Sequence, residues 1–272
     1  MDHTVIAAVQ LSSQADVGRN LDRVEVLIAE AARRGAAIVL LPENFAYLGG
    51  DEASKRAVAE DLGQADGPIA RRLSGLARTH GIDILGGGMP ERSSDPDRPF
   101  NTLAVFRKDG SVHAAYHKIH LFDVDLLERS YRESAAVTAG DEPVVIEAGG
   151  LRIGLSICYD LRFPELYRAL AARGADVLVV PAAFTVTTGK DHWHVLLRAR
   201  AIESQAYVVA AAQWGKHPGG RATYGKSCII DPWGEIIAQA SEGEGVITAS
   251  IDLTYLAHVR ESLPSLRHRR LV

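Results

Sequence analysis

Residues 4–41 read TVIAAVQLSSQADVGRNLDRVEVLIAEAARRGAAIVLL, and this stretch decides the fold. Its first part, Thr4 to Gln10, is short, apolar and partly β-branched, which predicts a buried strand. Apolar residues then recur at helical spacing from about Asn20 to Arg34, and Asn20 can cap the start of that helix. A second apolar run, Ala37 to Leu41, predicts another buried strand. A strand, a helix and a strand in this order predict a right-handed crossover between parallel strands.

The rest of the chain also alternates helices and strands, but antiparallel hairpins interrupt the parallel units. Further helices are predicted near Glu52 to Leu62, Pro68 to His80, Pro164 to Arg173 and His192 to Ser204. Hairpins are predicted where Asn101 to Phe106 precedes Val112 to Tyr116, where Val144 to Glu147 precedes Leu151 to Ile157, and where Ser227 to Ile230 precedes Glu235 to Ala238. This pattern favours an α/β fold with mixed sheets. Because no linker stands out, we expect residues 1–272 to form a single domain.

The composition is that of an ordinary globular chain. Of its 272 residues, 47% are hydrophobic and 24% are charged, which provides enough apolar sequence for a large core. The formal net charge of −4 does not favour binding to nucleic acid or to an anionic membrane. Two cysteines are no disulfide framework, and we find neither a secretory signal nor an apolar run of membrane-spanning length. We therefore expect a reducing, cytoplasmic setting without nucleic-acid or membrane partners.

Cys158 lies where an apolar strand ends, shortly before a helix that Pro164 can open. A nucleophile on such a strand-to-helix turn is held at the edge of a sheet, with backbone N–H groups nearby for an oxyanion. The alternative is a buried structural thiol, the commoner fate of an isolated cysteine, and the spacing alone leaves both interpretations open. Cys228 lies inside an apolar strand, where the structural interpretation is strongly favoured.

A cysteine nucleophile needs a base and an electrophilic partner for the oxyanion. Glu43 is a possible base if burial raises its pKa, since it ends a strand at the carboxyl edge of the presumed sheet. Lys118 ends a hairpin strand, where its ammonium can hold an oxyanion. Taken singly, these two side chains are more typical of a surface carboxylate and a solvated lysine. A cysteine–histidine pair also stays possible, with His117, His120, His192 or His194.

The same histidines are weak candidates for a metal site. They form the patterns His117-x-x-His120 and His192-x-His194, but no cysteine or carboxylate pattern accompanies them. Solvated or packing histidines are therefore favoured.

Three separated motifs together resemble the catalytic motifs of the nitrilase superfamily, the carbon–nitrogen hydrolases. They are LPEN at 41–44, HKIHLFD at 117–123 and CYDLRFPE at 158–165, and they occur in the family's order. The resemblance covers nearly the whole chain and implies a four-layer αββα sandwich with mixed sheets. It also implies pairing through a helical face into a homodimer or larger homo-oligomer.

The resemblance further implies a Glu-Lys-Cys triad formed by Glu43, Lys118 and Cys158. Many members of the family have a second glutamate after the lysine. Glu133, within YRES at 131–134, matches it better than the nearby Glu128. No metal and no organic cofactor is implied.

The branch of the family is indicated by the segments around 192–193, 197–203 and 207–213. They look most like the deaminated glutathione amidases, whose close relatives are the omega-amidases that act on small 2-oxo acid amides. Those relatives tend to have Gly-Pro-x-His-Trp-Glu where this chain has GKDHWH at 189–194. The sequence leaves open how the added Lys190 and the His194 in place of glutamate affect the substrate pocket.

The implied reaction hydrolyses a small carboxamide, such as deaminated glutathione, to an acid and ammonia through a cysteine thioester. Glu43 would take the proton of Cys158, which we expect to have a low pKa and to react quickly with thiol reagents near neutral pH. Lys118 and the backbone N–H of Tyr159 would hold the oxyanion. Arg162 is a candidate for binding a substrate carboxylate, the alternative being an ion pair with Glu165 or another acid.

The same triad would also suit other chemistry. The alternatives in the same class are an omega-amidase, an N-carbamoyl amino acid amidohydrolase and a nitrilase. An alternative of another class is an inactive binding or regulatory module.

Overall fold

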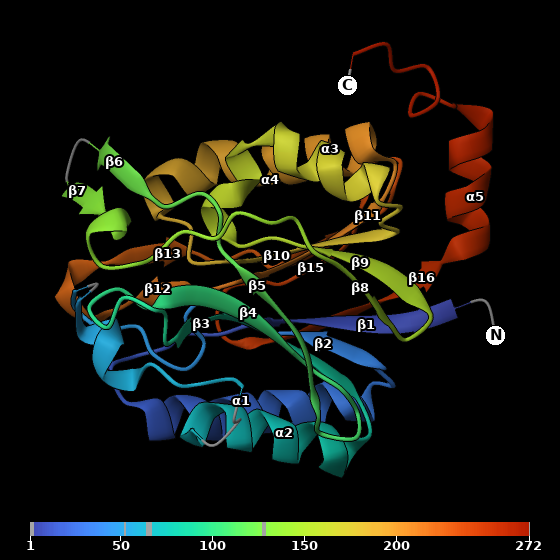
Figure 1. The fold of residues 1–272 in the computed structure, drawn as a ribbon. Helices are drawn as coiled ribbons and strands as arrows, with labels where there is room; N and C mark the ends of the chain where they lie inside the picture. The colour runs from blue at the N-terminus through green and yellow to red at the C-terminus, as the bar shows by residue number, and fades with distance from the viewer. Residues whose placement is uncertain (1–2, 52, 64–66, 127–128, 272) are drawn as a thin grey trace.

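The computed structural model of the chain describes residues 3–51, 53–63, 67–126 and 129–271, and it stacks two sheets between two layers of helices (Figure 1). The first sheet has the order β16 (Gly245–Asp252), β1 (His3–Gln10), β2 (Ile38–Leu40), β3 (Asp83–Glu91), β4 (Phe100–Phe106), β5 (Val112–His117). The second has the order β15 (Ile236–Gln239), β14 (Cys228–Ile230), β11 (Tyr207–Ala212), β10 (Val177–Ala182), β9 (Leu151–Leu155), β8 (Val145–Ala148).

Helices cover the outer faces of the two sheets (Figure 1). α1 (Val17–Arg33) and α2 (Pro68–His80) cover the first sheet, and α3 (Pro164–Ala172) and α4 (Val186–Ser204) cover the second. α5 (Leu253–Ser262) runs along one side of the sandwich. Two small hairpins complete it: β6 (Asp123–Leu126) with β7 (Arg129–Arg132), and β12 (Trp214–Lys216) with β13 (Ala222–Tyr224).

Both large sheets are mixed, as the alternation of crossovers and hairpins predicts. β1, β2 and β3 are parallel, whereas β16, β4 and β5 join that sheet as antiparallel neighbours. The second sheet repeats this plan, with β9, β10 and β11 parallel and the other strands antiparallel to their neighbours. The four-layer αββα architecture expected from the resemblance is therefore confirmed.

The core consists of two apolar clusters, because the central strands of the first sheet are buried on both faces. In β1, Ile6 and Ala8 point between the sheets, while the alternate residues Ala7 and Val9 pack against the helices. A strand with two buried faces needs an unbroken apolar run, which is what residues 5–9 supply. No helix in the described ranges is both long enough and apolar enough to cross a membrane.

Several element boundaries differ from the sequence predictions, and capping explains two of them. α1 begins at Val17 because the carboxylate of Asp16 accepts from the backbone N–H of Arg19. Asn20 instead lies inside the helix, where its amide donates to the backbone carbonyls of Gln14 and Ala46. Thr185 caps α4 in the same way, so that helix starts before His192.

One predicted helix is wrong in type. The stretch predicted as a helix from Glu52 to Leu62 contains only a short 3₁₀ turn, Ala53–Val58. Glu60, inside that stretch, uses its carboxylate to cap α2 by accepting from the backbone N–H groups of Ile69 and Ala70. Residue 52 lies outside the described residues.

The two sheets approach each other closely near Gly87 of β3. A side-chain carbon there would overlap the backbone oxygen of Leu41 and the ring of Pro181 on the facing sheet. We expect Gly87→Ala to lower the free energy of unfolding by about 1–3 kcal/mol, because neither neighbour can move away easily.

Gly75→Ala is the matched control for this change. Gly75 lies in α2 with open space around its α-carbon, so the substitution should raise the free energy of unfolding by about 0.5–1 kcal/mol. Urea denaturation of both variants checks this, and equal stability of the two would contradict the close approach of the sheets.

Candidate active site

The residues of the expected triad follow the ends of strands that share one edge of the sandwich. Glu43 comes after β2, Cys158 comes after β9 and opens a 3₁₀ turn, Cys158–Arg162, and Lys118 directly follows β5. β2 and β5 run in the same direction within their sheet, so their carboxyl ends lie at the same edge. Glu133 arrives from a separate 3₁₀ turn, Glu133–Ala135, after the β6–β7 hairpin.

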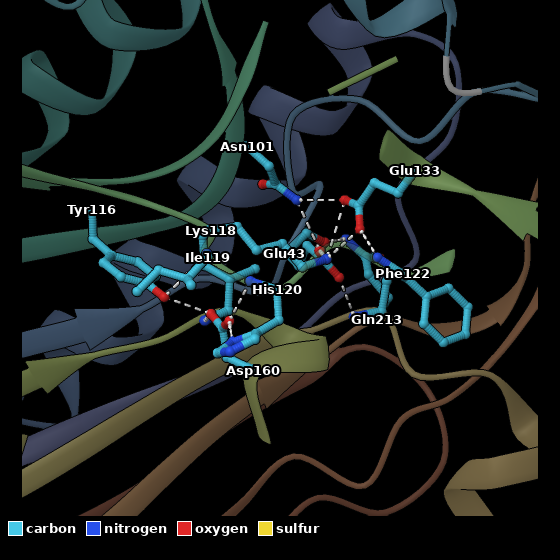
Figure 2. Close-up of polar contacts among 12 residues, drawn as sticks. Glu43, Asn101, Tyr116, Lys118, Ile119, His120, Phe122, Glu133, Asp160 and Gln213 are labelled. Atoms are coloured by element: carbon cyan, nitrogen blue, oxygen red, sulfur yellow. Dashed lines mark hydrogen bonds and ion pairs between the residues drawn. The ribbon is translucent and has the colours of Figure 1, made fainter. Parts of the chain in front are cut away.

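Lys118 joins the two glutamates (Figure 2). Its Nζ donates to Glu43 Oε1 at 3.0 Å and to Glu133 Oε2 at 2.8 Å and Oε1 at 3.1 Å. The lysine is 1% exposed, and both glutamates are buried. The side chains that the sequence argument proposed to act together therefore meet in one buried cluster.

Cys158 completes the cluster. Its thiol is hydrogen-bonded to the Glu43 carboxylate, and Oε2 of that carboxylate accepts from the backbone N–H of Ala183 at 2.9 Å. Cys158 has φ of +48°, which non-glycine residues rarely adopt. Such strain is found where surrounding structure fixes a functional side chain on a tight turn.

The electrostatics of the cluster favour an ionised glutamate and a neutral thiol. Burial alone would raise the pKa of Glu43, but the charges of Lys118, Lys55 and Arg221 and the Cys158 thiol lower it to about 2. Burial raises the pKa of Cys158, and the Glu43 charge raises it further, while Lys118 opposes this. Burial disfavours the charge on Lys118, yet Glu133 and Glu43 raise its pKa well above the ordinary value.

Two expectations from sequence are therefore wrong. The pKa of Glu43 was expected to be raised by burial, but neighbouring cations outweigh that effect. Cys158 was expected to have a low pKa, but burial and the adjacent carboxylate raise it. The resting site holds the thiol next to its base rather than a free thiolate.

Asp160 ties the nucleophile's turn to the lysine's loop (Figure 2). Its buried carboxylate accepts from the backbone N–H of Ile157, the hydroxyl of Tyr116 and the backbone N–H of His120, and it also contacts Nδ1 of His120. Burial and the charge of Asp160 raise the pKa of Tyr116, so that its hydroxyl stays a donor. Because Tyr116 and His120 flank Lys118, this carboxylate fixes Lys118 relative to Cys158.

The side chain of Gln213 holds the backbone around Glu43. The amide of Gln213, at the end of β11, donates to the backbone oxygen of Glu43 at 3.0 Å and to the hydroxyl of Ser13. Asn44, the next residue, has φ of +61°. Gln213, Asp160, Ala183 and Asn101, which contacts both glutamates, were missed by the sequence argument.

Some signal for these missed residues exists in the sequence. Gln213 and Asn101 are polar residues at the end of an apolar strand, as in the run RPFNTLAVF at 98–106, and Asp160 is a polar residue within a catalytic motif, whereas Ala183 contributes only a backbone N–H. Asp160 lies two residues after Cys158. A polar side chain in such a place must be satisfied by a partner when it is buried, but its partner cannot be read from spacing.

A pocket opens onto the cluster, whose Glu43, Lys118 and Cys158 form part of its lining. Tyr159 and Arg162, the two predicted substrate-binding residues, both line it, together with Phe122 and Phe184. The Arg162 guanidinium lies 5.1 Å from the centre of the Phe184 ring and contacts His192. Among the residues that the structure describes, it makes no ion pair with Glu165 or with another acid, and its role in binding a substrate carboxylate stays a prediction.

Other candidates from the sequence lie elsewhere. His117 pairs with Glu91, and His120 with Asp160. In the described part of the chain, no group of three histidine, cysteine, aspartate or glutamate side chains is placed to hold a metal ion. Lys190 and His194 do not line the pocket. Glu128 lies outside the described residues.

The chain matches the model of the carbon-nitrogen hydrolase family over residues 5–261. It is 47% identical to a deaminated glutathione amidase of Synechocystis sp. over 98% of each chain. It is 40% identical to an omega-amidase of Xenopus tropicalis, covering 97% of this chain and 94% of that one. The crystal structure of the C. elegans NitFhit protein superposes with a TM-score of 0.92 at 39% identity, over 99% of this chain and 66% of that longer chain.

The charges around Cys158 predict opposite effects for two substitutions. Glu43→Gln removes the negative charge that raises the thiol pKa, so we expect the Cys158 pKa to fall and alkylation at a given pH to become faster. Lys118→Met removes the opposing positive charge, so the pKa should rise and alkylation should slow.

Alkylation by iodoacetamide as a function of pH, followed by mass spectrometry of the Cys158 peptide, measures both effects. Cys228 is an internal control, because burial alone raises its pKa to about 12. Its reactivity should be the same in all three proteins. A shift in the same direction for both variants would contradict the described electrostatics.

Proposed function

The chain belongs to the carbon-nitrogen hydrolase family, a family of hydrolases for carbon–nitrogen bonds other than peptide bonds, and from this membership we propose that it is an amidase for a 2-oxo acid amide such as deaminated glutathione. The observation that carries the proposal is the buried lysine that joins Glu43 and Glu133 beside the Cys158 thiol. The 47% identity to a deaminated glutathione amidase supports the choice of substrate class.

The first half of the reaction forms a thioester. Glu43 accepts the thiol proton of Cys158 while the sulfur attacks the amide carbon, so that no free thiolate accumulates. The carbonyl oxygen becomes an oxyanion, which the Lys118 ammonium and the backbone N–H of Tyr159 stabilise. Collapse of this intermediate breaks the carbon–nitrogen bond. The proton held by Glu43 passes to the departing nitrogen, which leaves as ammonia from a primary amide or as an amine from a substituted one.

The second half hydrolyses the thioester. Glu43, ionised again, takes a proton from a water molecule as its oxygen attacks the thioester carbon. The same donors stabilise the second oxyanion. Its collapse releases the carboxylic acid and the Cys158 sulfur, to which Glu43 returns the proton. Glu133 keeps Lys118 in place through both halves, because its two oxygens both accept from the ammonium.

Arg162 is proposed to bind the carboxylate of the substrate. It lines the pocket, it has no acidic partner among the described residues, and aromatic rings hold its guanidinium in place. A guanidinium with no partner acid matches a carboxylate in a bidentate geometry. This favours an amide that carries a carboxylate over a neutral amide or a simple nitrile.

Three further features belong to the proposal. Residues 1–272 act as one carbon-nitrogen hydrolase domain, which the match over 5–261 supports. The cytoplasm is the proposed setting, because Cys158 and Cys228 are both free thiols. A homodimer or larger homo-oligomer is supported by apolar side chains exposed on α4, among them Val195 and Ile202.

A side-by-side substrate assay tests the function. Product release is measured from 2-oxo acid amides, carbamoyl amino acids and nitriles of similar size. We expect the 2-oxo acid amides to have the highest kcat/KM, Cys158→Ala to be inactive, and Lys118→Met to lose about two to three orders of magnitude in kcat. Activity of Cys158→Ala near that of the wild type would contradict the mechanism. A folded wild type that turns over none of the three classes would favour the binding-module alternative.

A second test addresses Arg162. We expect Arg162→Gln to raise KM for a carboxylate-bearing amide by about 10- to 100-fold, because it removes a charged hydrogen-bond donor pair, while the neutral analogue of that amide is affected little. Arg168→Gln is the matched control, since Arg168 lies on α3 outside the pocket and donates to the backbone oxygen of Glu203. Equal losses for the charged and the neutral amide would rule out carboxylate binding by Arg162.

A further inference from the structure

The amide of Asn101 stands between the two glutamates of the cluster (Figure 2). Its Nδ2 donates to Glu43 Oε1 at 3.0 Å and to Glu133 Oε1 at 3.3 Å. The same two oxygens accept from Lys118 Nζ, at 3.0 Å and 3.1 Å. Two nitrogen atoms, one charged and one neutral, therefore bridge the same pair of carboxylate oxygens.

The orientation of this amide leaves its oxygen atom without a hydrogen bond in the described part of the chain. Asn101 is 4% exposed, and its Oδ1 is buried with no hydrogen-bond partner among the residues that the structure describes. An orphaned buried acceptor is rare in folded proteins and is unfavourable. Rotating the amide would bring Oδ1 against two carboxylate oxygens, which would repel it. The side chain thus leaves its oxygen unsatisfied and uses both hydrogens of Nδ2 on the glutamates.

The surroundings hold Asn101 in this place. The residue lies in β4, and its backbone oxygen accepts from the backbone N–H of Lys118 at 2.9 Å, so the two bridging side chains start from paired positions. On the other side, a side-chain carbon at Gly88 would lie 2.9 Å from Oδ1 and 2.7 Å from Cγ of Glu43. Gly88 also has φ of +63°, so only glycine fits easily there.

We propose that Asn101 is a positioning residue that shares the bridging of Glu43 and Glu133 with Lys118, so that Oε1 of each carboxylate keeps a donor when the ammonium turns one hydrogen towards the oxyanion. This rests on the proposed mechanism, in which Lys118 serves the glutamates at rest and the oxyanion during catalysis. A neutral amide suits the role because it adds donors without adding a charge that would compete for the substrate. Asn101 does not touch the reacting atoms and acts only through Glu43, Glu133 and Lys118.

Two substitutions of similar size test the proposal. Asn101→Leu removes both donors, and Asn101→Asp replaces them with acceptors and a further acidic group. We expect kcat to fall by about 10- to 100-fold in Asn101→Leu and by more in Asn101→Asp, with KM changed little. In Asn101→Leu, the pH at which kcat/KM falls on the acidic side of its profile (the acid limb) should rise by about one unit. The reason is that the ionised form of Glu43 loses a hydrogen-bond donor.

Thr102→Val is the matched control. Thr102 is the next residue on β4 and is also buried, and its hydroxyl donates to a carboxylate, that of Glu91, outside the cluster. This variant should keep the wild-type kcat and the wild-type acid limb even if its melting temperature falls. Wild-type kcat and pH profile in both Asn101 variants would overturn the proposal, and so would a loss that Thr102→Val reproduces.

A measurement without substrate separates this proposal from the proposed function. Without the amide donors the Glu43 charge acts more strongly on the Cys158 thiol, so Asn101→Leu should slow iodoacetamide alkylation of Cys158 by about 3- to 10-fold. In a Glu43→Gln background the same substitution should have little effect, because the charge that the amide moderates is gone. Equal slowing in both backgrounds would overturn the role of Asn101. If alkylation slows only in the background that retains Glu43, but the enzyme hydrolyses no amide, the role of Asn101 stands and the assigned substrate class is contradicted.

Discussion

The buried contact between one ammonium and two carboxylates is the constraint on which the rest of the site depends. Lys118 is almost fully buried, and a buried charge is tolerated only when opposite charges and hydrogen bonds surround it. Glu43 and Glu133 meet that requirement from different parts of the chain, so the ends of β2 and β5 and the turn after β7 must converge. The αββα sandwich makes this possible, because its parallel crossovers bring strand ends from distant sequence to one edge.

The charge balance of the cluster explains how a nucleophilic cysteine stays protonated in the absence of substrate. Burial and the Glu43 charge keep Cys158 protonated, while Lys118 and nearby cations keep Glu43 ionised. When a substrate is bound, negative charge can develop on its carbonyl oxygen. Attack by the sulfur, proton transfer to Glu43 and stabilisation of the oxyanion by Lys118 then occur together. The strained backbone of Cys158 and the hydrogen bonds of Asp160 hold the sulfur and the ammonium in the geometry that this needs. The free energy gained by folding the whole domain offsets the cost of this strained geometry.

The sequence predicts the architecture well, for a physical reason, and it names side chains that meet in the buried cluster. Unbroken apolar runs such as residues 5–9 and 38–41 and the spacing of α2 report burial directly. The sequence predicts poorly the helix caps and pKa shifts that depend on a partner remote along the chain. Asp16, not Asn20, caps α1 because Asn20 finds carbonyl partners in a neighbouring loop. The pKa of Glu43 falls because Lys55, Lys118 and Arg221, all remote in sequence, lie around it. Asn101 and Asp160 act through contacts that no local pattern reveals.

The central claim is that Cys158 forms a thioester within this buried cluster, and a rapid-quench experiment tests it most directly. Enzyme is mixed with a 2-oxo acid amide for a single turnover, quenched in acid at successive times, digested and analysed by mass spectrometry. We expect the peptide containing Cys158 to gain the mass of the acyl group and to lose it as the free acid appears, while the Cys228 peptide is never modified. Formation of the acid with no acylated Cys158 peptide at any time would contradict it.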